Sequence, residues 1–218
     1  MKLVTGPFSL FGTKVEVALA EKGIDAEIEF VPYSFKTHYE PKHPEVLRLN
    51  PKKQVPVLID GDLEIFDSSL INEYLEDLHP SPALWPSDPK ARAEARLWEL
   101  KSDEVLFPLN ITVRGRLWTP DKISAEEAEA AMREASAFLA DLDRRLEGRD
   151  YVCDAFSYAD IALFFSTFFA ALMRLDKDAG PHLRAWRSRM LKRPSVAPTF
   201  ARLQSMLKEA GLPQPQWE

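Results

Sequence analysis

Residues 50–75 read NPKKQVPVLIDGDLEIFDSSLINEYL, and this stretch decides the fold of the N-terminal part of the chain. Two apolar runs, at 55–59 and 63–66, have the length of β-strands. The Asp60-Gly61 pair between them is a strong signal for a β-hairpin turn. A helix is expected to follow at 68–78. The stretch therefore predicts a hairpin followed at once by a helix.

The same stretch has the layout of a small-molecule pocket. Pro56 has no N–H to give to a sheet, so we expect it on an edge strand or at a bulge, where neighbouring main-chain groups stay free. Val55 is then a candidate to pair through its main chain with a peptide-like ligand. Asp67 and Ser68 open the expected helix, and the unpaired N–H groups of a helix N-terminus favour an anion. The ligand that suits both features is a short peptide with a carboxylate.

The rest of the chain predicts a mixed α/β part followed by an all-α part. A strand at 2–5, a helix at 10–22 and a strand at 26–31 form a β-α-β start, which brings two parallel strands together. Residues 33–49 are expected to be irregular to weakly helical, because His43-Pro44 breaks any long helix there. Four prolines between His79 and Pro89 predict a semi-rigid linker. Beyond it, helical periodicity predicts helices at 90–113, 124–147, 158–173, 180–192 and 196–210.

Three motifs resemble the cytosolic glutathione transferases. They are Asn50-Pro51 leading to the VPVL run at 55–58, Asp67-Ser68 at a helix start, and FSYADIAL at 156–163. The last is similar to the helical capping motif of that family. The resemblance extends over nearly the whole chain. It implies the glutathione transferase fold, with a thioredoxin-like domain at 1–79, a linker at 80–89 and a helical bundle at 90–218.

Charge and composition narrow the classes of partner. The 218 residues carry a net charge of −6 without a concentrated Lys/Arg block, so nucleic acid is not expected as a partner. The N-terminus lacks the apolar region of a secretory signal, and no apolar run approaches the ~20 residues that span a bilayer. A cytoplasmic protein without a membrane partner is expected. One cysteine, Cys153, and four scattered histidines give no metal-ligand spacing, so no metal is expected.

Glutathione chemistry requires a thiolate, so the loop between the first strand and the first helix is where a donor to the sulfur is sought. This loop, residues 5–13, has no tyrosine and no cysteine. By position, Ser9 resembles the serine of serine-type, bacterial-like members of the family, as a hydroxyl donor. Thr13 is the alternative, and Ser9 could instead only cap the helix. Without a cysteine in the loop, conjugation or addition and elimination is favoured over thiol exchange.

The resemblance also implies how glutathione is held. It implies a cis peptide bond at Val55-Pro56, and it places the γ-glutamyl end of glutathione at Asp67-Ser68. Lys42, Lys53 and Gln54 are candidates for the glycyl carboxylate, and Gln54 is preferred because it adjoins the strand. The family commonly has glycine at the position of Lys53, so the loop before the strand departs from the family pattern here.

A pocket for the second substrate is expected on the first long helices of the other domain. Phe107, Arg114 and Trp118 recur at spacings of seven and four, which puts them near one helical face if no break intervenes. Pro108 and Gly115 favour a kink or a break. A plain core stripe is the alternative. Arg114 would favour an anionic or electron-poor electrophile.

Two further features are expected to be structural. Ser157 and Asp160 have the spacing of a capping box, with Phe156 and Ile161 as its apolar contact. Cys153 is expected to be a small, partly buried apolar residue.

The expected function is that of a glutathione transferase, acting in detoxification as a cytoplasmic homodimer, in which the glutathione thiolate attacks a small hydrophobic electrophile. Glutathione is the substrate or co-substrate, and no metal is implied. One alternative is a non-catalytic glutathione-transferase-like module. Another is an isomerase or dehalogenase that uses glutathione as a cofactor.

Overall fold

The computed structural model describes residues 1–215 and 217, and the chain packs into two compact units. The first contains Met1–Leu84 and Pro194–Leu212, and the second contains Trp85–Arg193 and Pro213–Glu218. Residues 194–212, which the sequence places in the helical part, thus pack with the N-terminal unit. The domain boundaries themselves stay a prediction.

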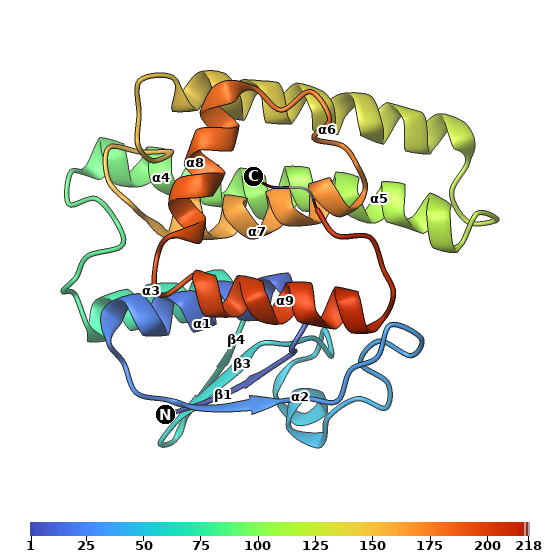
Figure 1. Cartoon of the computed structure of the whole chain (residues 1–218). Helices are drawn as coiled ribbons and strands as arrows, with labels where there is room; N and C mark the ends of the chain where they lie inside the picture. Colours follow the sequence, from blue (N-terminus) through green and yellow to red (C-terminus); the bar gives the residue numbers. More distant parts are fainter. Residues whose placement is uncertain (216, 218) are drawn as a thin grey trace. The chain divides into compact units, whose positions relative to one another are not determined.

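A four-stranded mixed sheet forms the centre of the first unit, in the order β2-β1-β3-β4 (Figure 1). β1 (Lys2–Thr5) runs parallel to β2 (Glu27–Phe30) and antiparallel to β3 (Val57–Asp60). β3 forms a hairpin with β4 (Leu63–Phe66). The predicted β-α-β start and the predicted hairpin are both confirmed, and with them the thioredoxin-like sheet.

The predicted edge position of Pro56 is wrong. β3 starts at Val57 rather than Val55, and it lies between β1 and β4 inside the sheet. Pro56 comes directly before the first paired residue, so the strand never requires the N–H that proline lacks. A short apolar run does not reveal which strands will flank it, so its local pattern suggested an edge.

Helices α1 (Leu10–Lys22), α3 (Ser68–Leu78) and α9 (Ala197–Glu209) lie on one face of this sheet (Figure 1). The fourth helix of the unit, α2 (Pro44–Leu49), is short and lies within the stretch that the sequence predicts to be irregular to weakly helical. Proline is tolerated in the first turn of a helix because no intrahelical N–H is needed there. Pro44 therefore starts α2 instead of preventing it.

The second unit is helical, as predicted, and its first long helix contains a π-helical segment. α4 (Pro89–Lys101) passes through a π-helical segment, η1 (Ser102–Leu106), into α5 (Phe107–Trp118). The predicted helix at 90–113 is therefore present, and helical structure continues from 89 to 118 with the π-helical segment inside it. Pro108 lies two residues after the π-helical segment, inside this continuous run of helix. Gly115 lies inside α5 without breaking it.

The core of this unit is built on α7 (Tyr158–Leu172), which packs against α4 and α5. α6 (Ala125–Leu146) packs against α5 and α8 (Pro181–Leu191), and Trp186 of α8 contacts Phe164 of α7 edge to face. The predicted capping box at the start of α7 is confirmed, because the main-chain N–H of Ser157 donates to Asp160 Oδ2 at 3.0 Å. Asp160 Oδ1 accepts from a main-chain N–H and from the Trp186 indole, each at 2.9 Å. This buried carboxylate therefore ties the start of α7 to α8.

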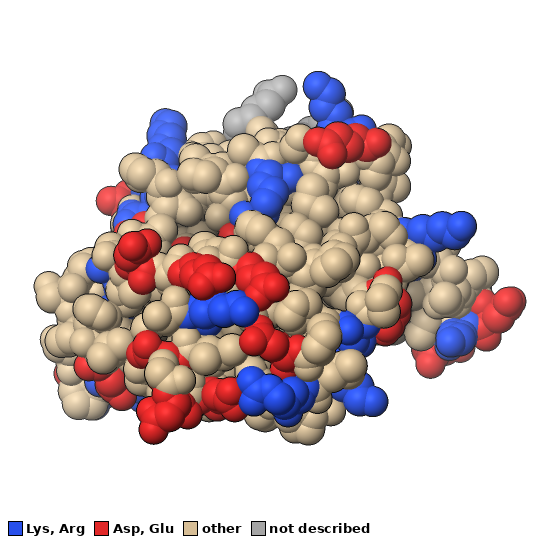
Figure 2. Space-filling view, turned by 90° about the horizontal axis from the view of Figure 1, so that it is seen from below, with Lys and Arg blue, Asp and Glu red and all other residues tan. Residues whose placement is uncertain are grey.

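Acidic and basic side chains are interspersed on the face of the molecule in Figure 2. Opposite charges also form ion pairs in the first unit: Lys2 Nζ lies 2.6 Å from a carboxylate oxygen of Glu29 and 3.0 Å from one of Glu45. Of the helices in the described part of the chain, none is long and apolar enough to cross a membrane. Over the same residues, His, Cys, Asp and Glu side chains form no group of three or more that could hold a metal ion.

Candidate functional site

The sheet brings three of the predicted site segments to one end. Val4 lies opposite Val57 in an antiparallel pair, so the loop that follows β1 starts beside the beginning of β3. Val57 in turn lies opposite Phe66. The residue before β3, Pro56, and the residue after β4, Asp67, are therefore neighbours across the hairpin. Register alone thus gathers the loop with Ser9, the Val55-Pro56 pair and the start of α3.

Ser9 lies at the N-cap of α1 and is 7% exposed. Its Oγ accepts from the main-chain N–H of Gly12 at 3.0 Å, so the capping role that the sequence left open is present. A hydroxyl that accepts in this way still has its own hydrogen to donate. Within the described residues nothing accepts that hydrogen. Capping and donation to a ligand are therefore compatible.

Thr13, the alternative donor, is already engaged. Its hydroxyl donates to the carbonyl of Leu10 at 2.7 Å, and its side chain is fully buried inside α1. A hydroxyl has one hydrogen, so Thr13 has none left for a ligand. The geometry favours Ser9 over Thr13.

Glycines allow this loop to pack closely. A Cβ on Gly12 would lie 2.0 Å from Thr5 Oγ1, so no larger residue fits there without a shift of the helix start. A Cβ on Gly6 would lie 2.5 Å from the ring and hydroxyl of Tyr39. The loop contains no tyrosine in sequence, yet the fold brings one against it.

The Val55-Pro56 peptide bond is cis, as the family resemblance implies. The loop before it is organised by the buried side chain of Asn50, whose Nδ2 donates to the carbonyl of Gln54 at 2.6 Å. Asn50 Oδ1 accepts from the Lys52 N–H at 2.9 Å. Val55 precedes the first residue of β3 and lies outside its ladder.

Lys53 stands where the family commonly has glycine. Its backbone is left-handed, with φ of 55°, a conformation that glycine adopts more readily than other residues. Of the other two candidates for the glycyl carboxylate, Gln54 is exposed and Lys42 is half-buried. Lys42 Nζ lies 3.4 Å from a carboxylate oxygen of Glu40.

Asp67 and Ser68 are at the start of α3, as predicted. Asp67 is the N-cap, with φ of 81°, and its Oδ1 accepts from the Ser69 N–H at 3.1 Å. Lys52 Nζ lies 3.8 Å from Asp67 Oδ2. The side chain of Ser68 is 4% exposed and makes no hydrogen bond within the described residues. A nearly buried hydroxyl without a partner at a helix N-terminus is suited to an anionic ligand.

Phe107, Arg114 and Trp118 lie on α5 of the second unit. Because α5 is continuous over all three, their spacing places them near one face of the helix. The guanidinium of Arg114 lies over the ring of Trp118, 5.7 Å from its centroid. Phe107 contacts Phe169 of α7 edge to face. Phe107 thus has core contacts, while Trp118 is exposed at the C-terminal end of the helix.

Four residues near these segments were missed by the sequence reasoning: Asn50, Lys52, Tyr39 and Asn72. Asn50 could have been identified, because it opens the motif that carries the family resemblance. The positions of Tyr39 and Lys52 depend on contacts between loops and leave no local signal. Asn72, one turn after Ser68 on α3, has both amide atoms buried without a hydrogen-bond partner among the described residues. Buried amides normally have hydrogen-bond partners, so a ligand or water that bonds to Asn72 is expected here.

Comparison with known proteins agrees with this geometry. A family model described as the N-terminal domain of glutathione S-transferase matches residues 8–78. A second, described as the C-terminal domain of glutathione S-transferase, matches residues 108–194.

The relatives in this comparison cover most of the chain. A probable glutathione S-transferase, parC, from Nicotiana tabacum is 34% identical over 87% of this chain and 84% of its own length. Glutathione S-transferase U19 from Arabidopsis thaliana is 32% identical with the same coverage of each chain. A crystal structure of a glutathione S-transferase from Methylobacillus flagellatus with glutathione bound superposes with a TM-score of 0.79 and 28% identity, over 91% of this chain and 98% of that one.

Proposed function

The chain belongs to the glutathione transferase family, and on that premise we propose that Ser9 donates a hydrogen bond to the sulfur of bound glutathione. The observation that carries the proposal is the hydrogen bonding of the two candidate hydroxyls, Ser9 and Thr13. The Thr13 hydroxyl has already given its hydrogen to the carbonyl of Leu10, whereas that of Ser9 is unused at the N-terminus of α1. Of these two candidates, Ser9 is therefore the one whose hydroxyl can serve a ligand.

The chemistry requires an ionised sulfur. A free thiol with a pKa near 8.5 is mostly protonated at neutral pH. To lower its pKa by about 2 units, the protein must stabilise the thiolate by about 2.7 kcal/mol more than the thiol. A hydroxyl donor and the positive end of a helix both stabilise the thiolate. Ser9 acts as a donor and not as a base, so the thiol proton leaves to solvent. The thiolate then attacks an electrophilic carbon and a carbon–sulfur bond forms. In a substitution the leaving group departs with the bonding electrons, and in an addition to an activated double bond the neighbouring carbon takes up a proton from solvent.

Glutathione is held along the loop and the hairpin in this proposal. The main chain of Val55, outside the β3 ladder and before Pro56, pairs with the peptide part, and Gln54 is the preferred contact for the glycyl carboxylate. Asp67 takes the α-ammonium of the γ-glutamyl end, and Ser68 takes its carboxylate. Support comes from the unpartnered hydroxyl of Ser68 beside an exposed Asp67 carboxylate.

The electrophile is proposed to be small and hydrophobic, and Phe107, Arg114 and Trp118 are proposed as its contacts. The cation over the Trp118 ring supports a preference for electron-poor aromatic substrates. We further propose that the protein is a cytoplasmic homodimer that acts in detoxification; sedimentation of the purified protein tests the dimer directly.

Steady-state kinetics test the proposal. The substrates are glutathione and an aromatic chloride activated by nitro groups. We expect Ser9→Ala to lower kcat by about a hundredfold, the loss typical of a single donor to a developing anion. Thr13→Val, which removes a hydroxyl that serves only the helix, should leave kcat within about threefold of wild type. Equal losses in the two variants would refute the role of Ser9.

The binding site for the γ-glutamyl end is tested separately. Ser68→Ala should raise KM for glutathione about tenfold with little change in kcat, because it removes one charge-assisted hydrogen bond. Ser87→Ala, at an exposed position, is the matched control. A wild-type protein that binds glutathione but converts no electrophile would favour the non-catalytic module instead.

A further inference from the structure

A cavity of about 640 Å³ lies wholly within the helical unit. This volume is within the range of pockets that take small molecules. Its walls come from the end of α7, the segment between α7 and α8, the start of α8 and the C-terminal residues. The charged and aromatic residues that line it are Arg174, Asp176, Lys177, Arg184, Arg187 and Trp217.

The lining is strongly cationic. Four of these residues are Arg or Lys and one is an acid, in a chain whose net charge is −6. A further acid, Asp143, lies near the start of α8 but does not line the cavity, and its Oδ1 accepts from the Leu183 N–H at 2.7 Å. A local concentration of positive charge against an acidic background favours an anion.

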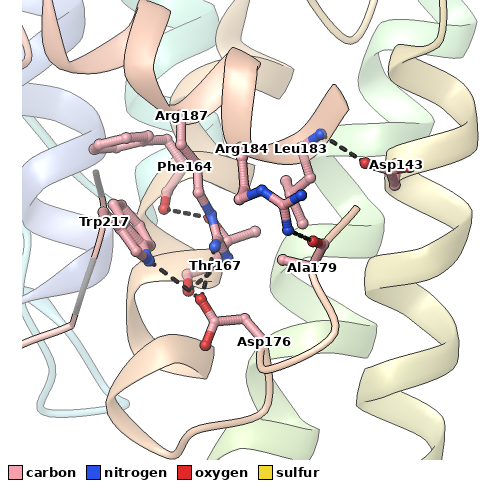
Figure 3. Close-up of polar contacts among 9 residues, drawn as sticks. All are labelled: Asp143, Phe164, Thr167, Asp176, Ala179, Leu183, Arg184, Arg187 and Trp217. Carbon is pink, nitrogen blue, oxygen red and sulfur yellow. Dashed lines mark hydrogen bonds and ion pairs between the residues drawn. The ribbon is translucent and has the colours of Figure 1, made fainter. Parts of the chain in front are cut away.

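Figure 3 shows the polar contacts of Arg187, Asp176 and Trp217 in this cavity. Arg187 is 3% exposed, and its Nη1 donates to Asp176 Oδ2 at 2.7 Å. The indole of Trp217 donates to the same oxygen at 3.2 Å, and the Arg187 guanidinium lies over the Trp217 ring, 4.3 Å from its centroid. The Arg187 Nη2 reaches the carbonyl of Thr167 at 3.4 Å, but its Nε is buried without a partner among the described residues. One carboxylate thus serves two donors, and the buried Arg187 Nε has no acceptor among the described residues.

The remaining cations are less constrained. Arg184 Nη1 donates to the carbonyl of Ala179, which uses one of its five N–H groups. Arg174 and Lys177 are exposed and make no ion pair or hydrogen bond within the described residues. These three side chains can therefore turn toward a ligand. The Arg187–Asp176 ion pair is more deeply buried and holds its two side chains in place.

We propose that this cavity binds a small organic carboxylate with a flat apolar group. The guanidinium groups of Arg174 and Arg184 match the two oxygens of a carboxylate, because a planar fork of N–H donors binds such groups in a bidentate way. Ala171, Ala179 and Pro215 supply apolar wall for the rest of the ligand. The site lies within one unit and does not depend on the proposed glutathione chemistry.

Calorimetric titration of the full chain with benzoate tests the proposal. The titration is made at low ionic strength with saturating S-methylglutathione, so that the proposed glutathione site is occupied. Benzamide, which has the same shape without the charge, is the ligand control. Arg174→Gln and Arg184→Gln remove lining cations, and Arg133→Gln removes an exposed cation of α6 as the matched protein control.

We expect one benzoate per chain, binding about tenfold weaker in each lining variant and unchanged in Arg133→Gln, as expected for loss of one charge-assisted hydrogen bond. Benzamide should show no binding. If Arg184→Gln does not fold, Arg174→Gln combined with Lys177→Gln takes its place. No heat with wild type at millimolar benzoate, equal affinity in the lining variants, or tighter binding of inorganic phosphate than of benzoate would overturn the proposal.

Discussion

Replacing Asp160 by alanine is expected to destabilise the helical unit strongly. The carboxylate is fully buried and accepts from the N–H groups of Val152 and Ser157 and from the indole of Trp186. Alanine leaves all three donors buried without an acceptor, at about 1–3 kcal/mol each. Because the three share one site, their costs do not add fully, and we expect a loss of about 3–5 kcal/mol.

Urea unfolding followed by circular dichroism measures this loss, with the midpoint and slope fitted separately. Asp154→Ala, at an exposed position in the preceding loop, is the matched control and should change the free energy of unfolding by less than about 0.5 kcal/mol. A loss below about 1 kcal/mol for Asp160→Ala would refute the claim that this carboxylate holds α7 and α8 together.

The pH dependence tests the same residue by sign. Burial raises the pKa of Asp160 from 3.8 to about 6, despite the hydrogen bonds that favour its ionised form. A carboxyl with a raised pKa contributes stability that is complete at low pH and is lost as the pH rises through about 6. Asp160→Asn stays neutral, so the stability difference between wild type and this variant should narrow by about 2 kcal/mol from about pH 4 to pH 7. A difference that widens with pH would contradict the account.

Three further predictions concern other parts of the chain. Gly12→Ala should cost about 1–3 kcal/mol in urea unfolding because its Cβ would lie 2.0 Å from Thr5 Oγ1, and adding Thr5→Ala should recover part of the loss. Arg202→Gln should cost about 3 kcal/mol by leaving Glu16 buried without its two ion contacts at 2.8 and 3.0 Å, whereas replacing both by leucine should cost much less. Burial raises the pKa of Cys153 to about 11, so a thiol reagent should label the folded protein about a hundredfold slower than free cysteine near pH 8, and a rate equal to that of free cysteine would show that the thiol is not buried.

Features that depend on neighbours in sequence could be predicted. The hairpin follows from Asp60-Gly61, where Gly61 has φ of 62°. The capping box of α7 follows from the spacing of Ser157 and Asp160. Ser9 at a helix start could also be placed, because serine is a strong N-cap residue. In each case the physical cause lies within a few residues of the position predicted.

Features that depend on distant contacts could not be predicted. β3 lies inside the sheet because β1 pairs with it, which no pattern within 55–59 encodes. α9 packs with the N-terminal unit, where Arg202 pairs with Glu16, 186 positions away. Tyr39 reaches Gly6 in the same way. The π-helical segment at Ser102–Leu106 has no turn residue to mark it.

The central claim is that Ser9 keeps the sulfur of bound glutathione ionised. The most direct test is the ultraviolet absorbance of the thiolate on titration of the protein with glutathione near neutral pH, with calorimetry in parallel to follow binding. The account predicts a thiolate band in wild type that is lost in Ser9→Ala while glutathione still binds. A band of equal strength in Ser9→Ala, or a wild-type protein that binds no glutathione, would contradict it.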